Sequence, residues 1–195
     1  MLKVLACCLT LLAIAIGGPA YAQPSAKGAH PTDQHDLTLS GGDYEEILTA
    51  VETWVSSQFD LPAIHEHPRI ELAPPAKITS LRFTDLLSDP KTQVEPNNRA
   101  SSAQHDTIAI YYDATRTIYL PEGWTGGTLA ELSVLVHEMV HHFQNVLGLK
   151  YECLQEREKL AYIAQDRWLA QFGHSLESDF QIDAFSLFVK TQCFY

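Results

Sequence analysis

The sequence predicts an α+β domain in which helices dominate and a small antiparallel sheet or hairpin packs against one of them. Two observations favour this class: several stretches repeat apolar residues at helical spacing, and two β-rich runs flank a short turn. The chain has 195 residues, 46% of them hydrophobic and 19% charged, which is ordinary for one globular domain. We therefore expect residues 43–195 to form a single domain.

The first 22 residues are typical of a secretory signal. Lys3 precedes a run at 4–16 that is apolar except for Thr10. Gly-Gly-Pro at 17–19 breaks any helix, and Ala-Tyr-Ala at 20–22 supplies small residues for a signal peptidase. Because the apolar run is too short for a transmembrane helix, we expect cleavage after Ala22 and no remaining membrane anchor. The sequence thus predicts a secreted or periplasmic protein.

The net charge limits the classes of binding partner that we expect, and the cysteines bear on the cellular compartment. The formal charge is −11, from 13 Lys and Arg against 24 Asp and Glu. Since nucleic acids and polybasic membrane anchors both require concentrated positive charge, neither is expected. Beyond the signal the chain retains Cys153 and Cys193, and an oxidising compartment favours one disulfide between them over two free thiols.

The first half of the chain begins with a Pro-, Ser- and Gly-rich stretch at 23–42, which predicts a flexible leader. Asp43 is then a plausible N-cap, because apolar residues recur at helical spacing directly after it. The elements predicted next are an amphipathic helix at 44–58, a short strand at 69–73, a helix at 76–87 and a loop at 88–105.

The second half predicts a hairpin followed by three helices. The runs at 107–112 and 116–120 are rich in β-forming residues, and Asp-Ala-Thr at 113–115 joins them. Helical spacing then extends over 128–147, 155–172 and 178–190, and the last of these is apolar almost all round.

The helix expected at 128–147 contains the pattern His-Glu-x-x-His, from His137 to His141. Residues four apart lie on one helix face, so both imidazoles can reach one cation. Glu138 lies about 100° around the helix from His137, close enough to act on a water bound to that cation. Nitrogen donors of this kind suit Zn²⁺.

A catalytic zinc site needs a third protein ligand, and the next helix offers Glu156 and Glu158. The two carboxylates lie about 160° apart around that helix, so only one can face the histidines. We favour Glu158, because Ala161 three residues later is small enough to let the two helices approach.

The pentad at 137–141 followed by Glu158-Lys-Leu-Ala resembles the gluzincin branch of zinc metallopeptidases, including its smallest members and secreted bacterial zincin-like domains of unknown function. The resemblance covers about 107–165. It implies a zincin-like fold and one Zn²⁺ per chain held by His137, His141 and Glu158. It also implies that Glu138 is the general base, and that an edge strand of the hairpin aligns an extended peptide.

One position departs from the larger gluzincins, which carry an Asp four residues after the ligand Glu to orient the first His. Tyr162 stands there in this chain. A ligand His needs an acceptor for its second nitrogen, and Asp166, Asp179, Asp183 or a backbone carbonyl could supply it. For the stabilisation of the oxyanion, the candidates are Tyr162 and His174.

Two other histidine patterns have simpler interpretations. His65-Glu66-His67 lies beside Pro68 and predicts a surface turn in preference to a metal fragment. His142 points about 100° away from the ligand face, where we expect it to pack or to bind a neighbouring carbonyl.

The function predicted is that of a secreted zinc metallopeptidase acting on a peptide or protein, whose backbone pairs with the strand at 107–112 or the strand at 116–120. One alternative is a non-catalytic periplasmic domain that keeps zinc for structure or ligand capture. Another is a helical interaction module that binds no metal.

Overall fold

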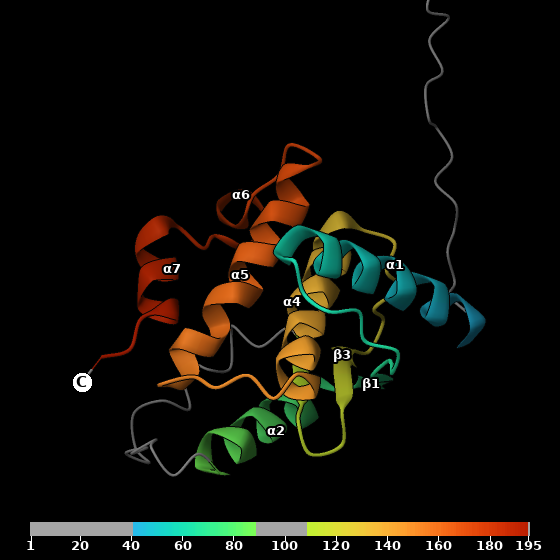
Figure 1. Ribbon diagram of the computed structural model, residues 1–195, viewed down its shortest axis with the longest axis horizontal. Coiled ribbons are helices and arrows are strands. Elements are labelled where there is room, and N and C mark those ends of the chain that lie inside the picture. The colour runs from blue at the N-terminus through green and yellow to red at the C-terminus, as the bar shows by residue number, and fades with distance from the viewer. Residues whose placement is uncertain (1–40, 89–108, 195) are drawn as a thin grey trace, which may run out of the picture. The chain divides into compact units, whose positions relative to one another are not determined.

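The computed structural model describes residues 41–88 and 109–194, which form an α+β domain dominated by helices, with one small sheet (Figure 1). The predicted signal, the leader up to residue 40 and the loop at 89–108 lie outside the described residues. The elements are α1 (Gly41–Phe59), β1 (Arg69–Ala73), α2 (Pro75–Ser88), β2 (Ile110–Tyr112), β3 (Thr117–Pro121), α4 (Leu129–Val146), α5 (Leu154–Ala170), α6 (Leu176–Phe180) and α7 (Ala184–Thr191).

The first helix is longer than the sequence suggested. Because α1 begins at Gly41, Asp43 lies within its first turn and is not its N-cap, and the last two residues assigned to the leader belong to the helix. The backbone leaves the helix at Asp60, which has a φ of 50°, ahead of Pro62.

The sheet is mixed, which corrects the expected antiparallel one. Its order is β1-β3-β2, with β1 parallel and β2 antiparallel to β3. The hairpin was predicted from local sequence, but β1 joins it only through a long-range parallel pairing that no local pattern specifies. Since β3 has partners on both sides, residues 116–120 cannot align a substrate, whereas β2 is an edge of the described sheet.

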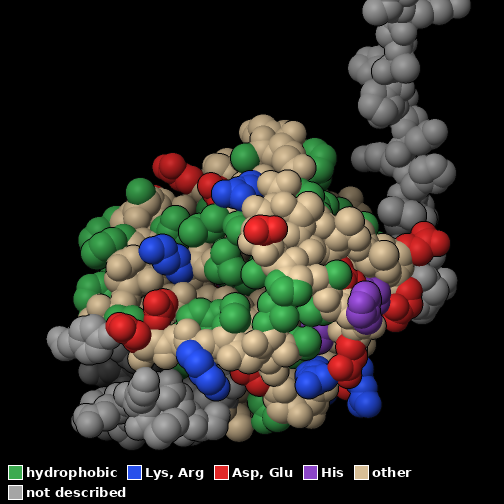
Figure 2. All heavy atoms as spheres, in the orientation of Figure 1, with side chains coloured by type: hydrophobic (Ala, Val, Ile, Leu, Met, Phe, Trp, Pro, Cys, Tyr) green, Lys and Arg blue, Asp and Glu red, His purple; other side chains and the backbone are tan. Residues whose placement is uncertain are grey.

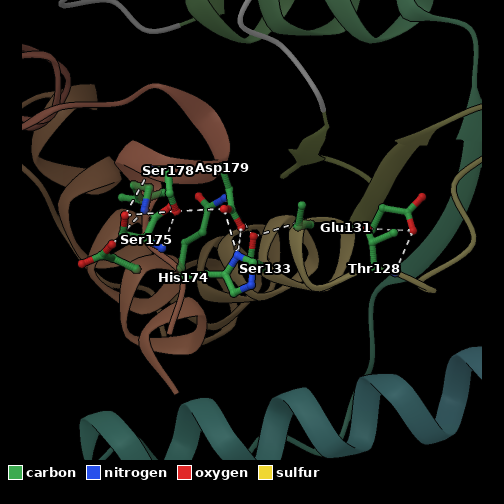
Figure 3. A network of polar contacts seen from close by, with 11 residues as sticks. Thr128, Glu131, Ser133, His174, Ser175, Ser178 and Asp179 are labelled. Atoms are coloured by element: carbon green, nitrogen blue, oxygen red, sulfur yellow. Dashed lines mark hydrogen bonds and ion pairs between the residues drawn. The ribbon is translucent and has the colours of Figure 1, made fainter. Parts of the chain in front are cut away.

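The central element is α4, which packs against α5, α1 and β2 (Figure 1). Thr128 and Glu131 form a capping box at its start, seen in Figure 3, and this fixes where the helix begins. Every side chain from Ser133 to Gln144 is buried. Polar groups within this stretch must therefore find partners inside the protein.

The C-terminal region corrects a second expectation, because residues 178–190 do not form one helix. Gln181 takes a left-handed conformation (φ 57°) that ends α6, and Asp183 caps α7 by accepting from the amide of Ser186. Several apolar side chains of α7 are exposed, among them Phe185 (74%) and Phe188 (52%). Hydrophobic side chains gather on the left of Figure 2, where α7 lies in Figure 1.

A disulfide joins Cys153 to Cys193, as predicted. Cys153 is also the N-cap of α5, so the bond ties the start of α5 to the segment that follows α7. None of the described helices is both long and apolar enough to cross a membrane.

The segment before β1 contains His65-Glu66-His67, which was predicted to form a surface turn. The prediction holds for only part of this segment. His65 and Glu66 are exposed, but His67 is half-buried between Glu45 and Glu52 of α1, at 2.8 and 3.0 Å. Burial lowers the pKa of His67, but the hydrogen bonds to these two carboxylates outweigh burial and raise that pKa above its ordinary value of 6.5.

We expect Cys193→Ser to lower the free energy of unfolding by about 2–4 kcal/mol, because the bond restricts the unfolded chain across 40 residues. Urea denaturation measures this. The difference from the unchanged protein should disappear when both proteins are reduced; if it persists under reduction, the loss comes from packing and not from the bond.

The contribution of His67 should depend on pH. Because its pKa is raised in the folded state, its ion pairs stabilise the protein fully below about pH 6.5 and lose this effect as the pH rises through the folded pKa. His67→Gln should therefore destabilise the protein more at pH 5.5 than at pH 9 in urea denaturation. His65→Gln, at an exposed position on the same segment, serves as the control, and a pH-independent loss at His67 would contradict the expectation.

Candidate metal centre

Three potential metal ligands meet between α4 and α5. The ligand atoms of His137, His141 and Glu158 all lie within 4.8 Å of one another, and we call these residues the His-His-Glu group. Nε2 of His137 is 3.1 Å from Oε2 of Glu158, and Nε2 of His141 is 3.5 Å from Oε1. Within the described residues this is the one cluster of His, Cys, Asp or Glu able to hold a metal ion.

The approach of α5 to α4 decides which carboxylate reaches the histidines. Ala161 and Ala164 are fully buried, so small side chains separate the two helices, as predicted for Ala161. Glu158 lies on this buried face. Glu156 is exposed and accepts a hydrogen bond from the amide of Glu152 instead.

The first histidine is held from behind by an amide side chain. Nδ1–H of His137 donates to Oε1 of Gln165 (3.1 Å), while Nε2 of Gln165 donates to the hydroxyl of Ser133 (3.3 Å). Because that hydroxyl itself donates to the carbonyl of Ala130, it can only accept from Gln165. The amide orientation is thereby fixed, and His137 presents Nε2 to Glu158.

The second histidine has a matching arrangement. Nδ1–H of His141 donates to Oε1 of Gln144 (2.8 Å), which also accepts from Nε of Arg157 (3.3 Å). Gln144 donates in turn to the carbonyl of Arg157, and the Arg157 guanidinium forms two hydrogen bonds with the carboxylate of Asp113, at 2.7 and 2.6 Å. His141 therefore also presents Nε2 to Glu158.

Gln165 and Gln144 are not the residues that the sequence predicted as acceptors for the second nitrogen of a ligand histidine. Asp166 accepts from the amide of Leu176, Asp179 pairs with His174, and Asp183 caps α7, so none of the three supports a ligand histidine. Gln144 could have been found from sequence, because it lies three residues after His141 on the same helix face. Gln165 could not, since its contact depends on how α5 packs.

The charges in the group support one another. Burial opposes ionisation of His141, but the adjacent Glu158 carboxylate outweighs it and raises the pKa of His141 above 6.5. Burial likewise opposes ionisation of Glu158, yet the two imidazoles hold the pKa of that carboxyl well below its usual range. Such mutually stabilised donors can hold a cation in place of the shared proton.

Glu138 lies beside the group without joining it. Its buried carboxylate accepts a hydrogen bond from the backbone amide of Tyr111 in β2, at 2.7 Å. Glu138 and the His-His-Glu group line the same pocket, which has a volume of about 270 Å³. The other lining residues are Arg82, Ile110, Tyr111, Leu154, Gln155, Arg157, Tyr162, Val189 and Lys190.

Of the two candidates for oxyanion stabilisation, only Tyr162 lies at the pocket. Tyr162 lines the pocket, and its ring meets that of His137 edge to face with centroids 4.7 Å apart. His174 is exposed and bonded to Asp179 beside the Ser175–Ser178 cap of α6, and it does not line the pocket (Figure 3).

His142 binds a backbone carbonyl, one of the two contacts that the sequence predicted for it. It is buried between the hydroxyl of Tyr111 (3.1 Å) and the carbonyl of Glu66 (2.6 Å). This residue therefore links α4 to the sheet edge and to the segment before β1, and it contributes no ligand to the His-His-Glu group.

A family model described as a domain of unknown function (DUF6647) matches residues 40–194, a range that includes every residue of the pocket. No curated protein and no solved structure matches the chain. The similarity to gluzincins, and with it the zincin-like fold, remains a prediction from the motif.

Replacing Glu158 with Gln should weaken metal binding by about tenfold or more, because the site loses its anionic ligand while keeping its shape. Glu156→Gln is the matched control: it removes an exposed carboxylate from the same helix and should leave affinity unchanged. Titration with Zn²⁺ against a competing chelator measures both. Equal affinities in the two variants would rule out Glu158 as a ligand.

Proposed function

The chain belongs to the DUF6647 family, and we propose that it is a zinc metallopeptidase in which Glu138 is the general base. One observation carries this proposal: a carboxylate outside the His-His-Glu group lines the same pocket. A non-catalytic zinc domain needs no general base, and a structural zinc site usually has four protein ligands.

The donor set fits zinc. Two imidazole nitrogens and one carboxylate are a known ligand combination for catalytic Zn²⁺, and both histidines present the same nitrogen because Gln165 and Gln144 hold the other. When bound, zinc would polarise the carbonyl of the substrate and lower the pKa of a water molecule to about 7.

Glu138 is placed to move the proton. Its carboxylate would take a proton from the attacking water and deliver it to the leaving nitrogen as the C–N bond breaks, so the amine leaves with that proton and the other product keeps the oxygen of the water as a carboxylate. The amide of Tyr111 holds the carboxylate in position. Tyr162 is the proposed donor to the negative oxygen of the tetrahedral intermediate, because its ring lies against His137.

The edge of the sheet is the proposed binding site for the substrate backbone. β2 pairs with β3 on one side, and Ile110 and Tyr111 line the pocket. An extended peptide could therefore add to this edge and bring one of its carbonyls to the metal.

We also propose that the protein acts in the periplasm or outside the cell. The signal-like sequence at 1–22 supports this location. The disulfide between Cys153 and Cys193 supports it independently, because such bonds persist in oxidising compartments.

Glu138→Gln should lower the rate of peptide cleavage by about 10²–10⁴-fold while the zinc content stays near that of the unchanged protein. Release of fluorophores from a mixed peptide library measures activity, and elemental analysis measures zinc. Glu122→Gln, at an exposed position outside the pocket, is the control and should retain activity. Full cleavage by the zinc-loaded Glu138 variant would contradict the proposed base.

A further inference from the structure

Arg82 of α2 is a cation in the pocket that has no partner among the residues that the structure describes. Its half-buried side chain lines the pocket together with His137 and Glu138. The guanidinium makes no hydrogen bond or ion pair with any residue that the structure describes.

The fold fixes the position of this side chain. Ile78, four residues earlier on the same face of α2, is buried against Ile110 and Tyr119 of the sheet. Arg82 therefore lies on the same face of α2 as the residue that packs against the sheet. Because Ile110 also lines the pocket, the packing that seats α2 brings the guanidinium to the site.

The remaining charges of the pocket already have partners. Arg157 is paired with Asp113, Glu158 with the two imidazoles, and Glu138 with the amide of Tyr111. The remaining cation that lines the pocket, Lys190, also has a partner. A bound divalent cation would offset both glutamates, which leaves the charge of Arg82 uncompensated. A half-buried cation without a counter-ion favours binding of an anion.

We propose that Arg82 binds a carboxylate of the substrate, so that the peptides cleaved carry a carboxylate close to the scissile bond. A guanidinium matches a carboxylate with two parallel hydrogen bonds. The carboxylate can be the C-terminus of a peptide or an acidic side chain. The inference rests on the proposed function, because it names the substrates of the same site.

Cleavage assays test the proposal and separate the two sources. Three N-acetylated peptide libraries suffice: neutral side chains with a free C-terminus, the same sequences amidated, and amidated sequences with one Asp or Glu. The full chain should cleave one of the carboxylate libraries about 10–100-fold faster than the neutral amidated one. Arg82→Gln should abolish this preference and spare the neutral library, whereas Arg69→Gln, at an exposed arginine outside the pocket, should keep it.

Binding provides a readout that does not need turnover. The same libraries are applied to immobilised, zinc-loaded Glu138→Gln protein, with and without Arg82→Gln, and the retained peptides are measured by mass spectrometry. Carboxylate peptides should be enriched about 10–100-fold only where Arg82 is present. Such enrichment without any cleavage by the unchanged protein would support the anion site and contradict the peptidase.

Two results would overturn the inference. Equal retention of acid and amide peptides would show that Arg82 does not bind a carboxylate of the peptide. An equal loss of cleavage for all three libraries in Arg82→Gln would assign Arg82 to stabilisation of the transition state, leaving the proposed function intact.

Discussion

Burial of α4 is the constraint on which the site depends. A buried imidazole or carboxylate is costly unless it is hydrogen-bonded, and α4 carries four such side chains within six residues: His137, Glu138, His141 and His142. Each has a partner from another part of the chain or from a neighbouring turn of α4. The requirement to satisfy these groups therefore fixes how α5, the sheet edge and the segment before β1 can pack on the helix.

Tyr111 alone provides hydrogen-bond partners for several polar side chains of α4. Its amide holds Glu138, and its hydroxyl meets His142 and Asn145 on the next turns of α4. Burial, with a smaller effect of nearby Asp113, raises the pKa of the Tyr111 phenol to about 12, so the hydroxyl stays neutral and can donate and accept. Because Asp113 also binds Arg157, a shift of the hairpin would disturb both the position of Glu138 and the support of His141.

The sequence predicted those parts of the site that depend on helical spacing. His137, Glu138 and His141 lie about one turn apart on a single helix. On the next helix Glu156 and Glu158 point in opposite directions, and the small Ala161 indicated that Glu158 faces the histidines. The parallel pairing of β1, the support from Gln165 and the position of Arg82 could not be predicted, because each depends on contacts between segments far apart in the chain. The break at Gln181 was not predicted, because the apolar spacing of residues 178–190 continues across it.

The two glutamates of the pocket differ in their partners, and this difference supports the different roles that we propose for them. Glu158 faces two imidazole nitrogens, so its charge is best balanced by a cation that all three residues share. Glu138 faces a neutral backbone amide, which orients the carboxylate without supplying a positive charge of its own. We therefore propose the carboxylate of Glu138 as the base and that of Glu158 as a metal ligand. α4 thus carries two of the proposed ligands, His137 and His141, together with the proposed base, Glu138, while α5 supplies the third proposed ligand, Glu158.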